Sequence, residues 1–139
     1  MNSTTSINVS RAFAAGVLGG LAMTIFMAIV RLTGIPVNVE AMLGSMFGLD
    51  PMATGTWLLG LVMHLMLSGL IALAYAWGFE RVTHRAGWTT GLVFSVVHIV
   101  IAGIAMVMIP LIHALIPEMM PAPGAFMANM GVVGVLLFV

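Results

Sequence analysis

The chain has 139 residues, of which 62% are hydrophobic and only 6% are charged, and it contains neither lysine nor cysteine. A soluble domain carries about 25% charged residues, so this composition excludes an ordinary water-soluble fold. The net charge of zero, without a basic cluster, gives no electrostatic basis for nucleic-acid binding. The absence of cysteine excludes disulfides and thiolate metal sites.

Three apolar runs are long enough to cross a bilayer, which takes about 20 helical residues. They cover about residues 12–33, 57–79 and 88–109. Tryptophans fall at the ends of these runs, where their rings prefer the membrane interface, and Pro110 can kink or end the third helix. The final run, 126–139, is too short to span untilted, so we expect a truncated fourth helix or a half-span. The prediction is one all-α domain over 1–139, a polytopic transmembrane helical bundle.

The arginines predict the orientation. Arg81 and Arg85 share the loop between the second and third runs, and Arg11 precedes the first run, so the positive-inside rule places the amino terminus and this loop in the cytoplasm. Arg31 alone opposes this orientation. We therefore expect a multi-pass protein of a bacterial inner (cytoplasmic) membrane, with the loops 34–56 and 116–125 on the outer side.

The first outer loop contains VEAMLGSMFG, in which Val39, Met42, Leu43 and Met46 recur at helical spacing. This pattern predicts a short amphipathic helix that lies in the interface or folds back into the bundle. Glu40 is expected to be a solvated charge at the start of this helix.

Small residues recur every fourth position in the first two runs. The first contains Gly16, Gly20 and Thr24, and the second contains Gly60, His64, Ser68 and Ala72. The third has a comparable set in Gly87, Gly91, Ser95 and Gly103. Such faces let helix backbones approach closely in lipid, so they predict packing seams rather than catalytic sites.

Two histidines, His64 and His98, lie near the middles of the second and third runs, at depths that would allow them to face each other. A polar ring at membrane depth is costly without a partner, so both are candidate site residues. The simplest interpretation is a hydrogen bond to a hydroxyl on a neighbouring helix, with Thr24, Ser68 and Ser95 available. A facing pair could instead hold a haem b or a chlorophyll-type pigment, or line a proton or solute pathway. A two-haem arrangement would need two histidines on each of two helices, whereas the second run offers only His64 and His113 lies beyond Pro110.

Fourteen methionines form a second signal, since thioethers favour Cu(I). His113, Met119 and Met120 cluster in IPLIHALIPEMMPAPG and could capture copper at the outer face. Methionine is also an adaptable filler of apolar cores, which explains most of the fourteen without a metal.

The segments GVLGGLAMT, VEAMLGSMFG, HLMLSGLIALAYAWGFE and IPLIHALIP resemble those of a group of small, uncharacterised bacterial membrane proteins with four predicted spans and a domain of unknown function. The resemblance covers most of the chain and implies a helical bundle without assigned catalytic residues. Members usually continue through a complete fourth helix, whereas this sequence stops at Val139.

Phosphate-binding loops and hydrolase motifs are missing from the sequence, so we expect no enzyme. The sequence predicts a non-catalytic binding or accessory subunit of a larger membrane assembly, in contact with lipid and with other subunits or further copies of itself. The alternatives are the tetrapyrrole or copper protein and a small channel or transporter.

Overall fold

The computed structural model describes residues 7–84 and 87–139, which form helices and connecting segments without a β-strand. The predicted all-α class is therefore confirmed. The chain divides into two compact units. Unit 1 comprises Met1–Gly44 and Leu49–Ala86, and unit 2 comprises Ser45–Gly48 and Gly87–Val139.

Unit 1 is built from two long helices and one short helix. These are α1 (Val9–Leu32), α2 (Val39–Gly44) and α3 (Thr54–Gly78), and α3 continues into a π-helical turn, η2 (Phe79–Thr83). The side chain of Asn8 caps α1 by accepting a hydrogen bond from the Arg11 backbone N–H at 3.0 Å. The chain leaves α1 through Gly34, which has a φ of 88°. Glycine adopts this backbone conformation at little cost in free energy because it has no Cβ.

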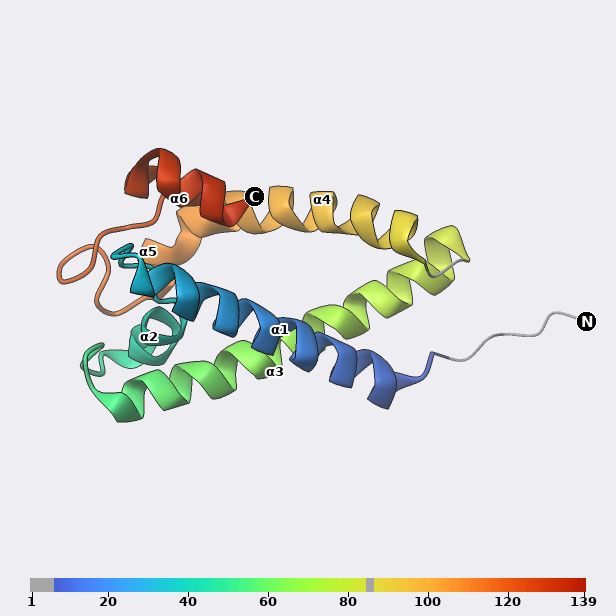
Figure 1. Ribbon diagram of the computed structural model, residues 1–139, viewed down its shortest axis with the longest axis horizontal. Helices are drawn as coiled ribbons and strands as arrows, with labels where there is room; N and C mark the ends of the chain where they lie inside the picture. The colour runs from blue at the N-terminus through green and yellow to red at the C-terminus, as the bar shows by residue number, and fades with distance from the viewer. Residues whose placement is uncertain (1–6, 85–86) are drawn as a thin grey trace, which may run out of the picture. The chain divides into compact units, whose positions relative to one another are not determined.

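The small residues of α1 and α3 form the predicted seam, along which the two helices cross (Figure 1). A Cβ placed on Gly16 would overlap the Ser68 carbonyl oxygen and the Ala72 side chain, and one on Gly20 would overlap the Ser68 side chain. The absence of side chains at these glycines thus sets the distance between the helices, as expected for packing in lipid.

The short helix α2 folds back onto α3, again through glycines. A Cβ on Gly44 would overlap the Thr56 carbonyl oxygen, and a Cβ on Gly60 would overlap the Glu40 carbonyl oxygen. Of the two alternatives for the loop helix, folding back into the bundle is therefore confirmed. Its buried residues are Glu40, Ala41 and Gly44, whereas the apolar stripe predicted from the sequence is only half-buried at Val39, Met42 and Leu43.

Unit 2 follows the predicted third run and the chain after it. Its elements are η1 (Ser45–Phe47), α4 (Trp88–Ala105), η3 (Met106–Met108), α5 (Ile109–Ile112), η4 (Ala125–Met130) and α6 (Gly131–Phe138). The α-helix gives way to a 3₁₀ turn at Met106 before Pro110, whose ring nitrogen cannot donate to the preceding turn.

The expected fourth helix over 126–139 is interrupted. Phe126 and Met127 have φ values of 52° and 57°, so regular helix begins only at Gly131. The Phe126 ring packs on Gly103 of α4 and meets Phe138 edge-on, with ring centroids 5.8 Å apart. This contact gives the left-handed backbone a packing role, since a side chain at position 103 would exclude the ring.

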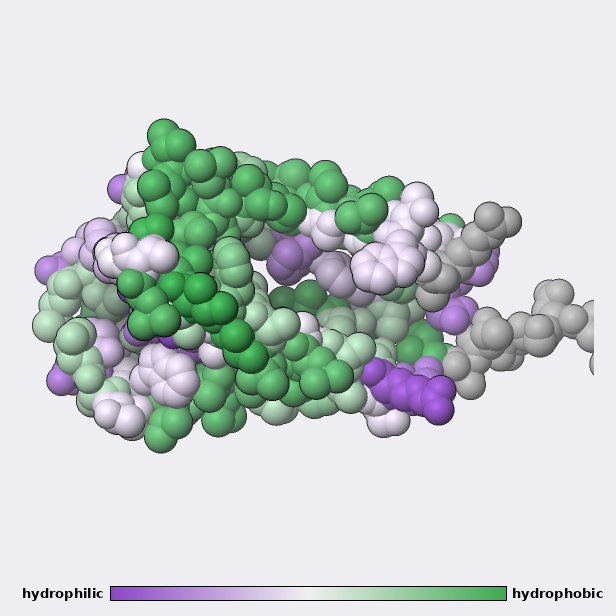
Figure 2. Space-filling view, viewed as in Figure 1, coloured by the Kyte–Doolittle hydropathy of each residue, from purple (hydrophilic) through white to green (hydrophobic). Residues whose placement is uncertain are grey.

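Three helical stretches are long and apolar enough to cross a membrane: Val9–Leu32, Thr54–Thr83 and Trp88–Ile112. Many of their large apolar side chains are exposed, among them Leu18, Ile29 and Val96. Figure 2 shows apolar residues over much of the face in view. Lipid accommodates such a surface, so the fold is compatible with an integral membrane protein.

Candidate functional site

The site in unit 1 begins with the cap of α2. The Asn38 side chain accepts a hydrogen bond from the Ala41 backbone N–H at 3.0 Å, which fixes the start of the helix. Glu40 therefore lies in the first turn, and the packing of its backbone against Gly60 directs the residue into unit 1. Its exposed fraction is 0%.

Arg31 forms an ion pair with one oxygen of this buried carboxylate. Its Nη1 donates to Glu40 Oε2 at 3.1 Å and to the Val37 carbonyl oxygen at 3.2 Å, and the arginine side chain is 24% exposed. Arg31 stands one residue before the end of α1, so the ion pair joins the end of α1 to α2 across the turn between them. A buried carboxylate is tolerated when it is paired in this way.

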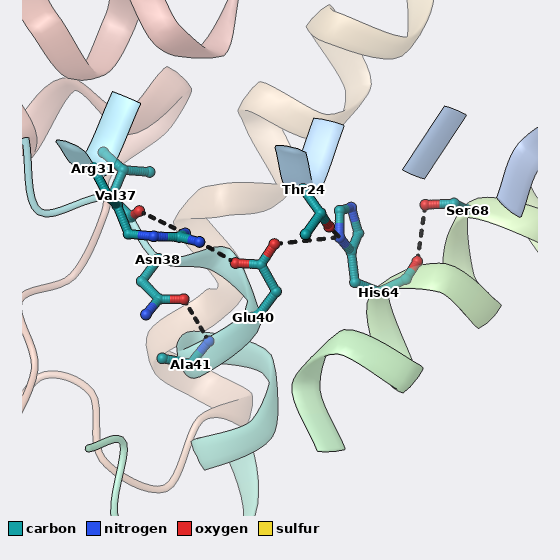
Figure 3. A network of polar contacts seen from close by, with 8 residues as sticks. All are labelled: Thr24, Arg31, Val37, Asn38, Glu40, Ala41, His64 and Ser68. Atoms are coloured by element: carbon teal, nitrogen blue, oxygen red, sulfur yellow. Dashed lines mark hydrogen bonds and ion pairs between the residues drawn. The ribbon is translucent and has the colours of Figure 1, made fainter. Parts of the chain in front are cut away.

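His64 lies on the other side of the carboxylate. It occupies the small-residue stripe of α3, one turn after Gly60 and one turn before Ser68, where α1 and α2 both pack against that helix. Its Nδ1 lies 3.2 Å from Thr24 Oγ1 and 4.0 Å from Glu40 Oε1. Figure 3 shows the carboxylate between the guanidinium and the imidazole ring.

The second oxygen of the Glu40 carboxylate lacks a hydrogen bond. Oε1 is buried and has no hydrogen-bond partner within residues 7–84 and 87–139, although Oε2 is paired with Arg31. Buried polar atoms are nearly always hydrogen-bonded, because an unpaired one loses its hydration without compensation. Oε1 is therefore an available acceptor, 4.0 Å from an imidazole nitrogen, for a hydrogen-bond donor or a cation.

The structure confirms part of the sequence prediction for this region and corrects another part. His64 points inward and meets the hydroxyl of Thr24, which is one of the expected partners, while Ser68 donates to the His64 carbonyl oxygen at 2.8 Å. The prediction that Glu40 is a solvated charge is wrong, because α2 folds back and buries it. The sequence does carry a signal for the Arg31–Glu40 ion pair, because the two charged residues lie nine positions apart in an otherwise apolar part of the chain.

His98 stands in unit 2, half-buried on α4, whereas His64 belongs to unit 1. Because the two histidines belong to different compact units, a tetrapyrrole shared by them stays a prediction. The Nδ1 of His64 already faces Thr24 and Glu40, which leaves Nε2 as the atom that would bind such a group. A carboxylate near the other ring nitrogen is common around metal-bound histidines.

A second polar cluster, formed by His113, Ser45 and Met120, lies inside unit 2. His113 is 4% exposed, and its Nδ1 accepts a hydrogen bond from the Leu115 backbone N–H at 3.2 Å. Because Nδ1 is an acceptor, Nε2 of the neutral ring carries the hydrogen and donates to Ser45 Oγ at 3.4 Å. The Ser45 hydroxyl in turn donates to Met120 Sδ at 3.6 Å.

The structure thus brings together two of the three residues predicted to capture copper. His113 and Met120 share Ser45, while Met119 is 73% exposed. In the part of the chain described, no group of three or more His, Cys, Asp or Glu side chains could hold a metal ion. The copper site stays a prediction, and both ring nitrogens of its histidine are engaged in hydrogen bonds.

Comparison of this chain with protein-family models, with curated proteins and with solved structures finds no match.

Proposed function

We propose that this chain is a membrane-embedded, non-catalytic binding component that takes up a small cation at the Glu40 carboxylate of unit 1. One observation carries the proposal: a fully buried carboxylate keeps one oxygen paired with Arg31 and the other unpaired. Ionisable groups at membrane depth are expensive, and they commonly mark ion or proton sites.

The surroundings of Oε1 favour a positively charged ligand. Oε1 accepts hydrogen bonds, Thr24 Oγ1 can accept one, and His64 Nδ1 can accept one when the ring is neutral. Arg31 stands at the end of α1, so the site is nearest to that end of the helix. In the other direction the seam of Gly16, Gly20 and Ser68 is closely packed, which favours a binding site over a continuous channel.

The experiment measures the unfolding midpoint of the purified protein in nanodiscs at constant ionic strength, with sodium, ammonium or protons as the varied cation. A ligand that binds only the folded state stabilises it, by about 2.7 kcal/mol at a concentration 100-fold above its Kd. We expect at least one of these cations to raise the midpoint of the wild-type protein but not that of Glu40→Gln. Asp50→Asn, which removes an exposed carboxylate of the same unit, is the matched control and should respond like the wild type.

Equal responses of the wild type and Glu40→Gln to all three cations would overturn the proposal.

A role as an accessory subunit of a larger assembly is a second proposal, supported by the small-residue face of α4. Within unit 2, a Cβ on Gly87 or Gly91 would meet no described atom within 4 Å, and the Ser95 side chain one turn further is exposed. We propose that a helix of a partner subunit packs there, in a bacterial inner membrane with the amino terminus on the cytoplasmic side. Native mass spectrometry after gentle extraction should give a complex that Gly91→Leu dissociates, and a stable wild-type monomer would contradict this role.

A further inference from the structure

We propose that the cation bound in unit 1 is a free ammonium ion, held by hydrogen bonds to Glu40 Oε1 and Thr24 Oγ1 beside the ring of His64. This inference rests on the proposed cation site and names its ligand. Helix α2 supplies the carboxylate, α1 the hydroxyl and α3 the imidazole, as Figure 3 shows. Glu40 and Thr24 are both buried, so an ion with a single heavy atom suits this junction of three helices.

The polar atoms at the junction are acceptors of hydrogen bonds. In the tautomer with the hydrogen on Nε2, His64 Nδ1 accepts a hydrogen bond from the Thr24 hydroxyl across 3.2 Å, and the hydroxyl oxygen keeps its own lone pairs. Glu40 Oε1 has no hydrogen-bond partner among the residues that the structure describes. The Ser68 hydroxyl, the next polar side chain on α3, already donates to the His64 carbonyl oxygen. The ligand must therefore bring the hydrogen-bond donors itself.

The charge of the carboxylate favours a cationic donor over a neutral one. A hydrogen bond in which donor or acceptor is ionised is roughly twice as strong as a bond between neutral groups. Arg31 holds the other carboxylate oxygen, Oε2, and its side chain is 24% exposed. Solvent therefore screens the guanidinium more than it screens the buried Oε1, which leaves negative charge on the inner side of the carboxylate.

An ammonium ion suits these acceptors better than a metal ion does. Hard cations such as Ca²⁺ take about six to eight oxygen ligands and often both oxygens of a carboxylate, whereas Oε2 already accepts a hydrogen bond from Arg31. Within residues 7–84 and 87–139, no group of three or more His, Cys, Asp or Glu side chains could hold a metal ion. The N–H groups of ammonium need only one acceptor each, at an N···O distance of about 2.9 Å.

The test compares ammonium with potassium, an ion of similar size that carries no N–H group. It measures the unfolding midpoint of the full chain in phosphatidylcholine nanodiscs at constant pH and ionic strength, while the concentration of either chloride salt is varied. We expect ammonium, but not potassium, to raise the midpoint of the wild type to a plateau, because the ligand binds only the folded state. Glu40→Gln should abolish this rise. Equal effects of the two ions on the wild type would overturn the inference.

Thr24→Val tests the second hydrogen bond. It replaces the hydroxyl by a methyl group of similar size, and the affinity for ammonium, obtained from the dependence of the midpoint on concentration, should fall by at least about fivefold. Thr33→Val is the matched control, because its hydroxyl lies at the exposed end of α1 and donates to the Val30 carbonyl oxygen. This control should bind ammonium as the wild type does. A smaller loss in Thr24→Val, or an equal loss in both variants, would contradict the inference.

Two further outcomes separate the ligand from the site. Phosphatidylethanolamine carries a primary ammonium group, so if the lipid were the ligand, nanodiscs of this lipid would stabilise the wild type over Glu40→Gln and added ammonium would have no further effect. That result would overturn the assignment to a free ion. If sodium or protons, but not ammonium, stabilise the wild type and not Glu40→Gln, the cation site survives and only its identification with ammonium fails. If every ion acts equally on both proteins, the proposed function fails as well.

Discussion

His64 and His113 differ in the groups that face their rings. The ring nitrogens of His113, in unit 2, meet the Leu115 backbone N–H and the Ser45 hydroxyl. His64 of unit 1 has a hydroxyl on one side and a buried carboxylate oxygen without a hydrogen bond on the other. Residues of one type, each inside an apolar unit, thus meet different electrostatic surroundings.

Burial alone therefore does not distinguish the surroundings of the two rings. His113 is the more buried, yet its hydrogen bonds run in one consistent direction, from Leu115 through the ring and Ser45 to Met120. Such a satisfied network holds a fold together. Beside His64 one acceptor, Glu40 Oε1, lacks a hydrogen bond, and the proposed cation site rests on that oxygen.

The largest effect is expected from a substitution that moves α2 without changing any polar side chain. Gly60→Ala places a methyl group against the Glu40 carbonyl oxygen, so α2 must separate from α3. We expect a loss of about 3 kcal/mol in the free energy of unfolding, at the upper end of overpacking effects, together with loss of the cation response. The measurement is reversible unfolding in detergent micelles.

Gly55→Ala is the matched control, because it lies in the same helix and no described atom is within 4 Å of its added methyl group. There the better helix propensity of alanine should stabilise the protein by up to about 1 kcal/mol. Equal stability of the two variants would show that close packing at Gly60 does not hold the site.

The sequence allowed the helices to be predicted, because hydropathy and glycine spacing report directly on lipid contact and helix approach. The seam of Gly16 and Gly20 against Ser68, and the inward position of His64, follow from spacing along single helices. The burial of Glu40 does not follow from spacing. It depends on the turn after α1 returning the chain, so that a six-residue helix packs backbone to backbone on α3.

For a related reason, the hydropathy of the sequence does not predict the interruption before α6. FMANMGVVGVLLF is continuously apolar or small apart from Asn129, so hydropathy alone extends the helix to Phe126. The left-handed backbone at Phe126 and Met127 instead accompanies the packing of the Phe126 ring on Gly103, which is a tertiary contact. Tertiary contacts of this kind override local propensity.

A smaller effect is expected from a substitution in the polar cluster of unit 2. Ser45→Ala removes the acceptor for His113 Nε2–H and the donor to Met120 in a fully buried position. We expect a loss of about 2 kcal/mol, the cost of a buried polar group left unpaired, with the cation response intact. Ser95→Ala, which removes an exposed hydroxyl bonded only locally to the Leu92 carbonyl, should cost less than about 0.5 kcal/mol. Loss of the cation response in Ser45→Ala would mean that the two histidine environments are not independent.

The smallest effect concerns Met119, the exposed member of the predicted copper cluster. Its side chain is 73% exposed, so Met119→Leu should change the free energy of unfolding by less than about 0.5 kcal/mol. Titration with Cu(I) under reducing conditions should give the same affinity as the wild type within twofold. Copper bound by His113 and Met120 would first have to displace Ser45 from both of them, so Ser45→Ala is the variant expected to strengthen any binding. A tenfold weaker affinity in Met119→Leu would instead restore the three-residue copper site and give unit 2 a ligand of its own.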